Sequence, residues 1–317
     1  MICKALRFFL LAAGVAASSL ATAQPFPSRT VRLVIGFGPG GVTDVLARLV
    51  AEQMAKRLGQ PVVVENRPGA SGLIAAQAVK SAAPDGHTLL GGSVTIFSPV
   101  YLSNGLVATK EFAPVATTAL GDWFLYVPTN LGINSLRDLV AWTKANPGKL
   151  RAASGAVSAH MLTAILAKRL GIEFEPVPYK TTDQAIVGTL NGDVQINFNA
   201  LSGFTPHLQS GKLKAIATLA PQRVANMPDV PTATEQGVPL VLRVNHGIWA
   251  PAGTPRDVVM RLNAVVNESL SEASLAEKIR NQSLLVVPMT PEEMVKAYES
   301  EMAFFTEAAA AIGFKPQ

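Results

Sequence analysis

The chain has 317 residues, of which 49% are hydrophobic and only 15% charged, and its formal net charge is +5. This length predicts about two domains, and the high apolar content excludes a disordered chain. A single cysteine, Cys3, excludes a disulfide framework and a cysteine-based zinc site, and the 4 histidines are too scattered to suggest another metal site. The lysines and arginines form no basic run, so we expect no nucleic-acid partner.

The N-terminal segment 1–23 carries the features of a secretory signal peptide. Lys4 and Arg7 provide the positive start, 8–15 form a short apolar stretch, and Ala21-Thr22-Ala23 is a small-x-small cleavage site. The apolar stretch is shorter than the roughly 20 residues of a membrane span, and no later run is long enough either. We therefore predict export with cleavage after Ala23; the alternative is an N-terminal helix buried in the fold.

Strand and helix patterns alternate through the N-terminal part of the mature chain. The β-branched run at 31–35 predicts a strand, and apolar residues at spacings of three and four predict a helix from 42 to about 58, where Gly59 stops it. A strand at 61–64, a helix starting near Ser71 and a strand at 88–90 follow. This β-α-β-α-β order predicts a parallel sheet covered by helices.

The middle and the C-terminal part continue this alternation. Ser135 and Asp138 form a capping-box-like start of a helix that ends near Asn146. Thr254-Pro255 and Thr290-Pro291 each pair an N-cap residue with proline at the first helical position, which predicts two long C-terminal helices. In chain order, the further elements expected are a strand at 150–153, a helix at 159–170, strands at 177–179, 194–198 and 213–219, and helices at 255–270 and 291–312.

One glycine-rich turn, Gly36-Phe37-Gly38-Pro39-Gly40-Gly41, follows a predicted strand and precedes a predicted helix. It fits the G-x-G-x-x-G pattern of dinucleotide-binding folds, and Glu65 occupies the place of the ribose-binding acid. A nicotinamide-dependent oxidoreductase is therefore one alternative. Against it, Pro39 has no N–H for a phosphate, and the charge of Asp44 would repel a pyrophosphate.

The same turn can bind a smaller anion. Glycines bring the helix N-terminus and its unpaired N–H groups to the edge of the sheet, where one carboxylate fits better than two phosphates. We expect glycine to be required at Gly40 and Gly41, because a Cβ would crowd the anion or, at a positive φ, strain the backbone. The second glycine turn, 66–72, opens another helix and is predicted to face the same crevice. A tight turn without a ligand is the other interpretation.

A hydrolase is an alternative from another class. No G-x-S-x-G motif is present, because Leu73 follows 69–72. His160 lies near Ser158 in the sequence, but no acid is placed to orient it. We therefore predict no catalytic residues.

Several short motifs, each weak alone, occur in a specific order along the mature chain. In that order and spacing the chain resembles the substrate-binding proteins of tripartite tricarboxylate transporters, also called the Bug family. The motifs that carry the resemblance are at 37–44, 64–72, 83–90, 145–150, 177–180, 227–232 and 250–255.

The resemblance implies an α/β, two-lobe periplasmic-binding-protein-like fold of type II, in which each lobe is a mixed sheet flanked by helices. Lobe 1 would comprise 24–123 and 247–317, and lobe 2 would comprise 124–246. Such a protein closes over a small carboxylate in the periplasm and delivers it to membrane transporter subunits. We expect a monomer that is not an enzyme and that needs no cofactor and no metal.

The glycine turns and the resemblance together predict one ligand site. Asn199 stands where the family often has aspartate, and Asn197 is neutral too, which leaves Asp44 as the acidic candidate for a ligand ammonium. We therefore expect a carboxylic acid without an α-ammonium group. The predicted ligand-binding residues are Phe37, Gly38, Pro39, Gly40, Gly41, Thr43, Asp44, Ala70, Ser71, Gly72, Ser93, Thr95, Ser154, Ser158, Tyr179 and Asn199.

Overall fold

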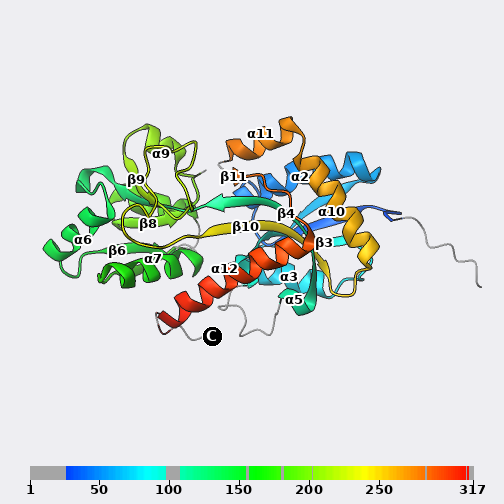
Figure 1. Ribbon diagram of the computed structural model, residues 1–317, viewed down its shortest axis with the longest axis horizontal. Coiled ribbons are helices and arrows are strands. Elements are labelled where there is room, and N and C mark those ends of the chain that lie inside the picture. Colours follow the sequence, from blue (N-terminus) through cyan, green and yellow to red (C-terminus); the bar gives the residue numbers. More distant parts are fainter. Residues whose placement is uncertain are drawn as a thin grey trace, which may run out of the picture.

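The computed structural model describes residues 26–97, 108–154, 157–179, 182–201, 203–282, 284–311 and 313. The predicted signal peptide and its cleavage site after Ala23 lie outside these residues. Two sheets, each with its own helices, lie side by side along the long axis of the molecule (Figure 1). We call the body around the six-stranded sheet the first lobe and the body around the five-stranded sheet the second lobe.

The sheet of the first lobe has the strand order β11-β4-β10-β3-β1-β2. Strand β1 pairs in parallel with β2 and β3, whereas β10 is antiparallel to β3 and β4, and β11 is antiparallel to β4. Because β1, β2 and β3 are parallel, their carboxyl ends meet at one edge of the sheet. The strands are β1 (Val31–Ile35), β2 (Val62–Asn66), β3 (Thr88–Ser93), β4 (Phe112–Asp122), β10 (Arg243–Pro251) and β11 (Leu284–Leu285).

Helices cover both faces of this sheet. On one face α2, α10 and α11 enclose an apolar core that includes Leu46, Met54 and Leu262. On the other face α3 packs with Trp249 of β10 and with Tyr298 of the C-terminal helix. The helical elements of this lobe are α2 (Val42–Leu58), η2 (Ala70–Gly72), α3 (Leu73–Lys80), η3 (Val94–Phe97), α5 (Ala108–Glu111), α10 (Arg256–Leu270) and α11 (Ala273–Asn281).

The sheet of the second lobe has the order β7-β6-β8-β5-β9. Strand β6 is parallel to β7 and β8, and β5 is antiparallel to β8 and β9, so both sheets of the molecule are mixed, as predicted. The elements are β5 (Phe124–Pro128), η4 (Thr129–Leu131), α6 (Leu136–Ala145), β6 (Arg151–Ser154), α7 (Val157–Leu170), β7 (Glu175–Pro178), α8 (Thr182–Asn191), β8 (Ile196–Asn199), α9 (Thr205–Gln209) and β9 (Leu213–Thr218).

The two lobes are linked by two strand crossings and by the last helix. The chain passes from β4 to β5 at Trp123 and returns to the first sheet where β10 begins at Arg243. The start of α12 (Pro291–Ala311) packs in the core of the first lobe through Tyr298, while Phe305 near its end packs in the core of the second lobe. Figure 1 shows α12 running beneath both lobes. No helix in the described ranges is long and apolar enough to cross a membrane.

Candidate ligand-binding site

The two predicted glycine turns are in direct contact at the carboxyl edge of the first sheet. A Cβ added at Gly36 would overlap the Cα of Gly72, so only glycine allows the two backbones this approach. Gly72 has a φ of +98°, and a Cβ there would lie 2.7 Å from Cγ2 of Ile96. The turns that follow β1 and β2 are therefore fixed beside each other.

A buried carboxylate ties these turns together. Oδ2 of Asp44 accepts hydrogen bonds from the Gly40 amide and from Nε of Arg48, both at 3.0 Å. Oδ1 of Asp44 accepts from Nδ2 of Asn66 at 2.9 Å, and the same Nδ2 donates to the carbonyl of Phe37 at 3.0 Å. The side chain of Asp44 therefore joins the first turn, the start of α2 and the second turn.

These contacts set the charge state and the availability of Asp44, which is only 3% exposed. The hydrogen bond from Arg48 is the main cause that lowers the pKa of Asp44, and the hydrogen bonds from Asn66 and Gly40 lower it further. Burial acts in the opposite direction but is outweighed, and the pKa is about 2. Asp44 is thus ionised and already bonded to protein donors. The amide of Gly40 is also occupied, so it is not available to a ligand.

Other amides at these turns remain free of helical acceptors. The first hydrogen bond of α2 runs from the Val45 amide to the Gly41 carbonyl at 3.0 Å, so the amides of Val42 and Thr43 precede the hydrogen-bonded ladder.

At the second turn, Ala70 has a φ of +44°, a strained backbone for a residue with a Cβ. Strain of this kind persists where surrounding contacts enforce it, and here it lies within the second turn, which contacts the first.

The two glycines before α2 differ in backbone conformation. Gly40 has a φ of +87° and so needs glycine. Gly41 is the N-cap of α2 with a φ of −74° and a ψ of 166°, an extended conformation that any residue can adopt. A Cβ at Gly41 would meet nothing nearer than the Gly38 carbonyl oxygen at 4.0 Å. The condition of a positive φ therefore holds at Gly40 and not at Gly41, and the crowding of a bound anion by a Cβ at Gly41 stays a prediction.

The third strand end of the first lobe carries a hydroxyl pair. Oγ of Ser93, which is buried at the end of β3, lies 3.0 Å from Oγ1 of Thr95 and accepts a hydrogen bond from the Thr95 amide at 3.3 Å. Across the sheet, His246 of β10 is the partner of Ser93. Burial lowers the pKa of His246 to about 4, so its imidazole is neutral.

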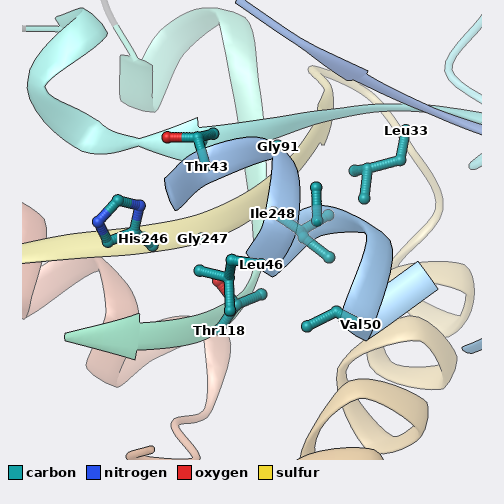
Figure 2. A pocket seen from close by; sticks show the side chains of 11 residues that line it. Leu33, Thr43, Leu46, Val50, Gly91, Thr118, His246, Gly247 and Ile248 are labelled. Atoms are coloured by element: carbon teal, nitrogen blue, oxygen red, sulfur yellow. The ribbon is translucent and has the colours of Figure 1, made fainter. Parts of the chain in front are cut away.

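A small cavity of about 10 Å³ lies between the first half of α2 and strands β1, β3, β4 and β10. Figure 2 shows Thr43 and His246 on one side of it and Leu33 and Val50 on the other. This volume is enough for about one water molecule, and its lining is mostly apolar. A carboxylic acid ligand does not fit inside it.

In the second lobe three predicted residues lie at or beside the carboxyl ends of parallel strands. Ser154 ends β6, Asn199 ends β8, and Tyr179 follows β7. Oγ of Ser154 lies 3.2 Å from Nδ1 of His160, whose pKa is lowered by burial, and Oδ1 of Asn199 accepts from the amide of the next residue at 2.9 Å. Ser154 and Asn199 therefore share the edge that the topology predicts for a ligand site.

The remaining predicted residues are placed differently. The hydroxyl of Tyr179 lies against α8, where a Cβ at Gly188 would overlap it, and burial is the main cause that raises its pKa. Ser158 lies in the first turn of α7 and is partly exposed. The backbone of Ser71 forms part of η2, but its side chain lies outside the described part of the structure. The amide of Tyr179 donates to the Ser154 carbonyl at 3.3 Å, so its backbone lies beside Ser154, whereas its hydroxyl lies against helix α8.

Sequence reasoning missed the residues that hold the turns. Asn66 and Arg48 were not predicted as site residues, yet both bond Asp44, and Nη2 of Arg48 also donates to Oδ1 of Asn66 at 3.0 Å. The signal available was the i,i+4 spacing of Asp44 and Arg48 on one helix face. Among the described residues, no group of three histidines, cysteines or acids is placed to hold a metal ion.

The chain matches a known receptor family over most of its length. The tripartite tricarboxylate transporter family receptor matches residues 46–306. This chain belongs to that family. The match confirms the resemblance, and the family is one of transporter receptors rather than of enzymes, which does not favour the oxidoreductase or hydrolase alternative.

Solved structures of similar proteins confirm the fold. Rpa4515 of R. palustris, solved with adipate, is 30% identical with a TM-score of 0.84, and 92% of this chain covers 100% of that one. The periplasmic binding protein BugD is 29% identical with a TM-score of 0.80 over 92% and 100% of the two chains. MatC of Rhodopseudomonas palustris, solved with malate, is 32% identical with a TM-score of 0.78 over 89% and 99%. The two-lobe α/β fold predicted from the family motifs is thus the fold of this receptor.

Proposed function

We propose that this receptor is a periplasmic solute-binding protein that captures a small carboxylate between its lobes and delivers it to the membrane subunits of a tripartite tricarboxylate transporter. The observation that carries the proposal is the contact between the two donor turns, held by Asp44 at the carboxyl edge of the first sheet. The lobes would be 24–123 with 247–317, and 124–246. Periplasmic location agrees with the predicted signal peptide and with the location of the related BugD.

The ligand carboxylate would lie where free amides and hydroxyls converge. In the first lobe these are the amides of Val42 and Thr43 at the start of α2, whose positive dipole end favours an anion, and the hydroxyls of Ser93 and Thr95. Ser154 and Asn199 would contact the ligand from the second lobe. Because these groups lie on different lobes, a bound ligand would favour the closed arrangement of the two.

The charges at the site favour an acid that carries no ammonium group. Asp44 is the one acid among the predicted site residues, and its oxygens already accept from Gly40, Arg48 and Asn66. In the second lobe Asn197 is buried and donates to Thr189 at 3.0 Å, and Asn199 is neutral. A ligand ammonium would find no unpaired counter-charge at these residues. Adipate and malate, bound by the related proteins, also lack an ammonium group.

Native mass spectrometry of the protein released from the periplasm tests this function. We expect a chain that begins after Ala23 and that carries a small acid, removable by dialysis against denaturant. A thermal-shift panel of carboxylic acids then measures binding, and ligand at about 100 times its dissociation constant should add about 2.7 kcal/mol to stability. The proposal would be contradicted if no carboxylate in the panel stabilised the protein, or if the protein turned over an ester or nicotinamide substrate.

A further inference from the structure

Positive charge is unevenly divided along the chain. Residues 124–246, which contain the second lobe, have eleven lysines and arginines against seven acids, whereas 24–123 together with 247–317 have fourteen against fifteen. All of the net positive charge of 24–317 therefore lies in the part that contains the second lobe. Five exposed basic residues there, which we call the basic tip, lie on and after α6 and at the start of β9: Arg137, Lys144, Lys149, Lys212 and Lys214.

The topology of the second sheet brings the basic tip together. Strand β5 ends where the antiparallel strand β9 begins, and the chain then leads into α6. Nζ of Lys214 in β9 donates to Oδ1 of Asn134, just before this helix, at 2.7 Å. Arg137 and Lys144 are seven residues apart, about two helical turns, so they lie on one face of α6. Figure 1 shows α6 at the end of the long axis that lies away from the first lobe.

The fold does not compensate the charge of the basic tip. None of its five side chains forms an ion pair with a residue in the described ranges, and the one acid of α6, Asp138, accepts a hydrogen bond from the Asn134 amide at 2.9 Å. The first lobe differs, because basic side chains such as Arg32, Lys56 and Lys80 are each paired with an acid. The basic tip therefore presents positive charge that is open to an outside partner.

The kind of charge indicates the kind of partner. Four of the five residues of the basic tip are lysines, which act as point charges, whereas recognition of a single carboxylate or phosphate favours the arginine fork. Arg137 and Lys144 lie about 10 Å apart along the axis of α6, so the charge is spread over a surface. A bilayer with anionic lipids offers many single negative charges over such an area, and each nearby lysine or arginine strengthens binding about fivefold.

We propose that the basic tip binds the anionic lipid surface of a membrane and so attaches the second lobe to it. The tip is separate from the proposed ligand site, because β5 begins beside Asn199 and ends at the opposite edge of the sheet. Attachment through the tip therefore leaves Ser154 and Asn199 uncovered. A receptor held in this way has a higher local concentration beside subunits that lie in the same membrane.

Cosedimentation of the mature chain with lipid vesicles tests this inference. We expect binding to phosphatidylcholine vesicles that contain about 30% phosphatidylglycerol and none to pure phosphatidylcholine. Raising the salt from about 0.1 to 1 M shortens the Debye length from about 10 to 3 Å and should release the protein. Arg137→Gln, Lys144→Gln and Lys149→Gln combined remove three charges of the basic tip and should weaken binding about 100-fold.

The matched control combines Lys110→Gln, Arg261→Gln and Lys278→Gln, which remove three exposed charges of the first lobe and should leave vesicle binding unchanged. An equal loss in this control would show attraction by net charge rather than by the tip. The inference would also be overturned if the wild type did not bind the anionic vesicles, or if the tip variant bound them as tightly as the wild type. Binding to membranes of the producing cell but not to protein-free vesicles would assign the tip to an acidic protein surface instead.

Carboxylate binding by the same variants keeps this inference distinct from the proposed function. Because the tip lies at the opposite edge of the sheet from Asn199, calorimetry should give the same carboxylate affinity for the tip variant as for the wild type. Reduced carboxylate affinity in the tip variant would show that the tip acts on the ligand site, which contradicts a separate lipid surface. Vesicle binding by a wild type that binds no carboxylate would leave this inference standing while the proposed function fails.

Discussion

Replacing Asp44 by asparagine removes the charge that holds the two donor turns together. In the folded chain Arg48, Asn66 and Gly40 lower the pKa of this buried carboxyl from 3.8 to about 2. Each pKa unit corresponds to about 1.36 kcal/mol, so ionised Asp44 contributes about 2 kcal/mol of stability. At about 2–4 °C per kcal/mol, Asp44→Asn should lower the melting temperature by about 4–8 °C at neutral pH.

The pH dependence of this difference has a definite sign. A carboxyl whose pKa is lower in the folded state contributes its full stability above the unfolded pKa, near 3.8, and loses it as the pH falls through about 2. The gap in melting temperature between Asp44→Asn and the wild type should therefore be constant above about pH 5 and shrink in acid. Differential scanning calorimetry across this range measures it.

Asp257→Asn is the matched control, because Asp257 is an exposed acid in the first turn of another helix, α10. It should change the melting temperature by a degree or two at most, as expected for an exposed charge near a helix N-terminus. If Asp44→Asn were as mild as Asp257→Asn, the carboxylate would not hold the turns and the reasoning would be refuted.

Three further substitutions follow from the same structure. Gly40→Ala places a Cβ at a φ of +87° and should lower the free energy of unfolding in urea by about 1–2 kcal/mol. Gly41→Ala, at a φ of −74°, should lower it by less than about 1 kcal/mol, and the reverse order would contradict the backbone argument. Asn66→Ala keeps the net charge but removes the hydrogen bonds from Asn66 to the Phe37 carbonyl and to Asp44, so calorimetry should show weaker carboxylate binding. Unchanged affinity would refute a positioning role for Asn66. Glu301 accepts a hydrogen bond from Asn245 at the lobe crossing, and burial raises its pKa to about 8. The stability of the wild type should therefore fall as the pH rises from about 4.5 to 8, and Glu301→Gln should remove this pH dependence in thermal melts.

Elements with a clear local pattern were predictable from the sequence. Helix α2 starts at Val42 and ends at Leu58, as the apolar spacing and Gly59 predict, and Gly59 has the left-handed φ of 68° that suits a C-cap. The start of α6 is also as predicted, because the amide of Asp138 donates to Oγ of Ser135 at 3.0 Å. In both cases residues within one helical turn decide the structure.

Elements that depend on distant partners were not predictable. Strands β4 and β10 were missed, although they pair along most of their length and carry the chain between the lobes. Strand β10 contains Asn245, His246 and Gly247, which read as loop residues, but the sheet and α12 bury them. The bond between Asp44 and Asn66 likewise joins residues of different turns. Only the parallel pairing of β1 with β2 brings them together.

The site residues likewise divide into those that local sequence predicts and those that depend on distant partners. The two glycine turns were found from local sequence, because glycine at a strand end before a helix has few other uses. The packing of Tyr179 on Gly188 was not visible, since it depends on how α8 packs against the sheet of the second lobe.

Isothermal titration of matched acid pairs tests the central claim most directly. Malate with aspartate, 2-hydroxyglutarate with glutamate, and lactate with alanine each differ by a hydroxyl in place of the ammonium. Because Asp44 is already paired within the site, we predict that at least one hydroxy acid binds and that its amino-acid partner binds at least about 100-fold more weakly. Tighter binding of the amino acid in each pair that binds would contradict the account and would place a free counter-charge at the site.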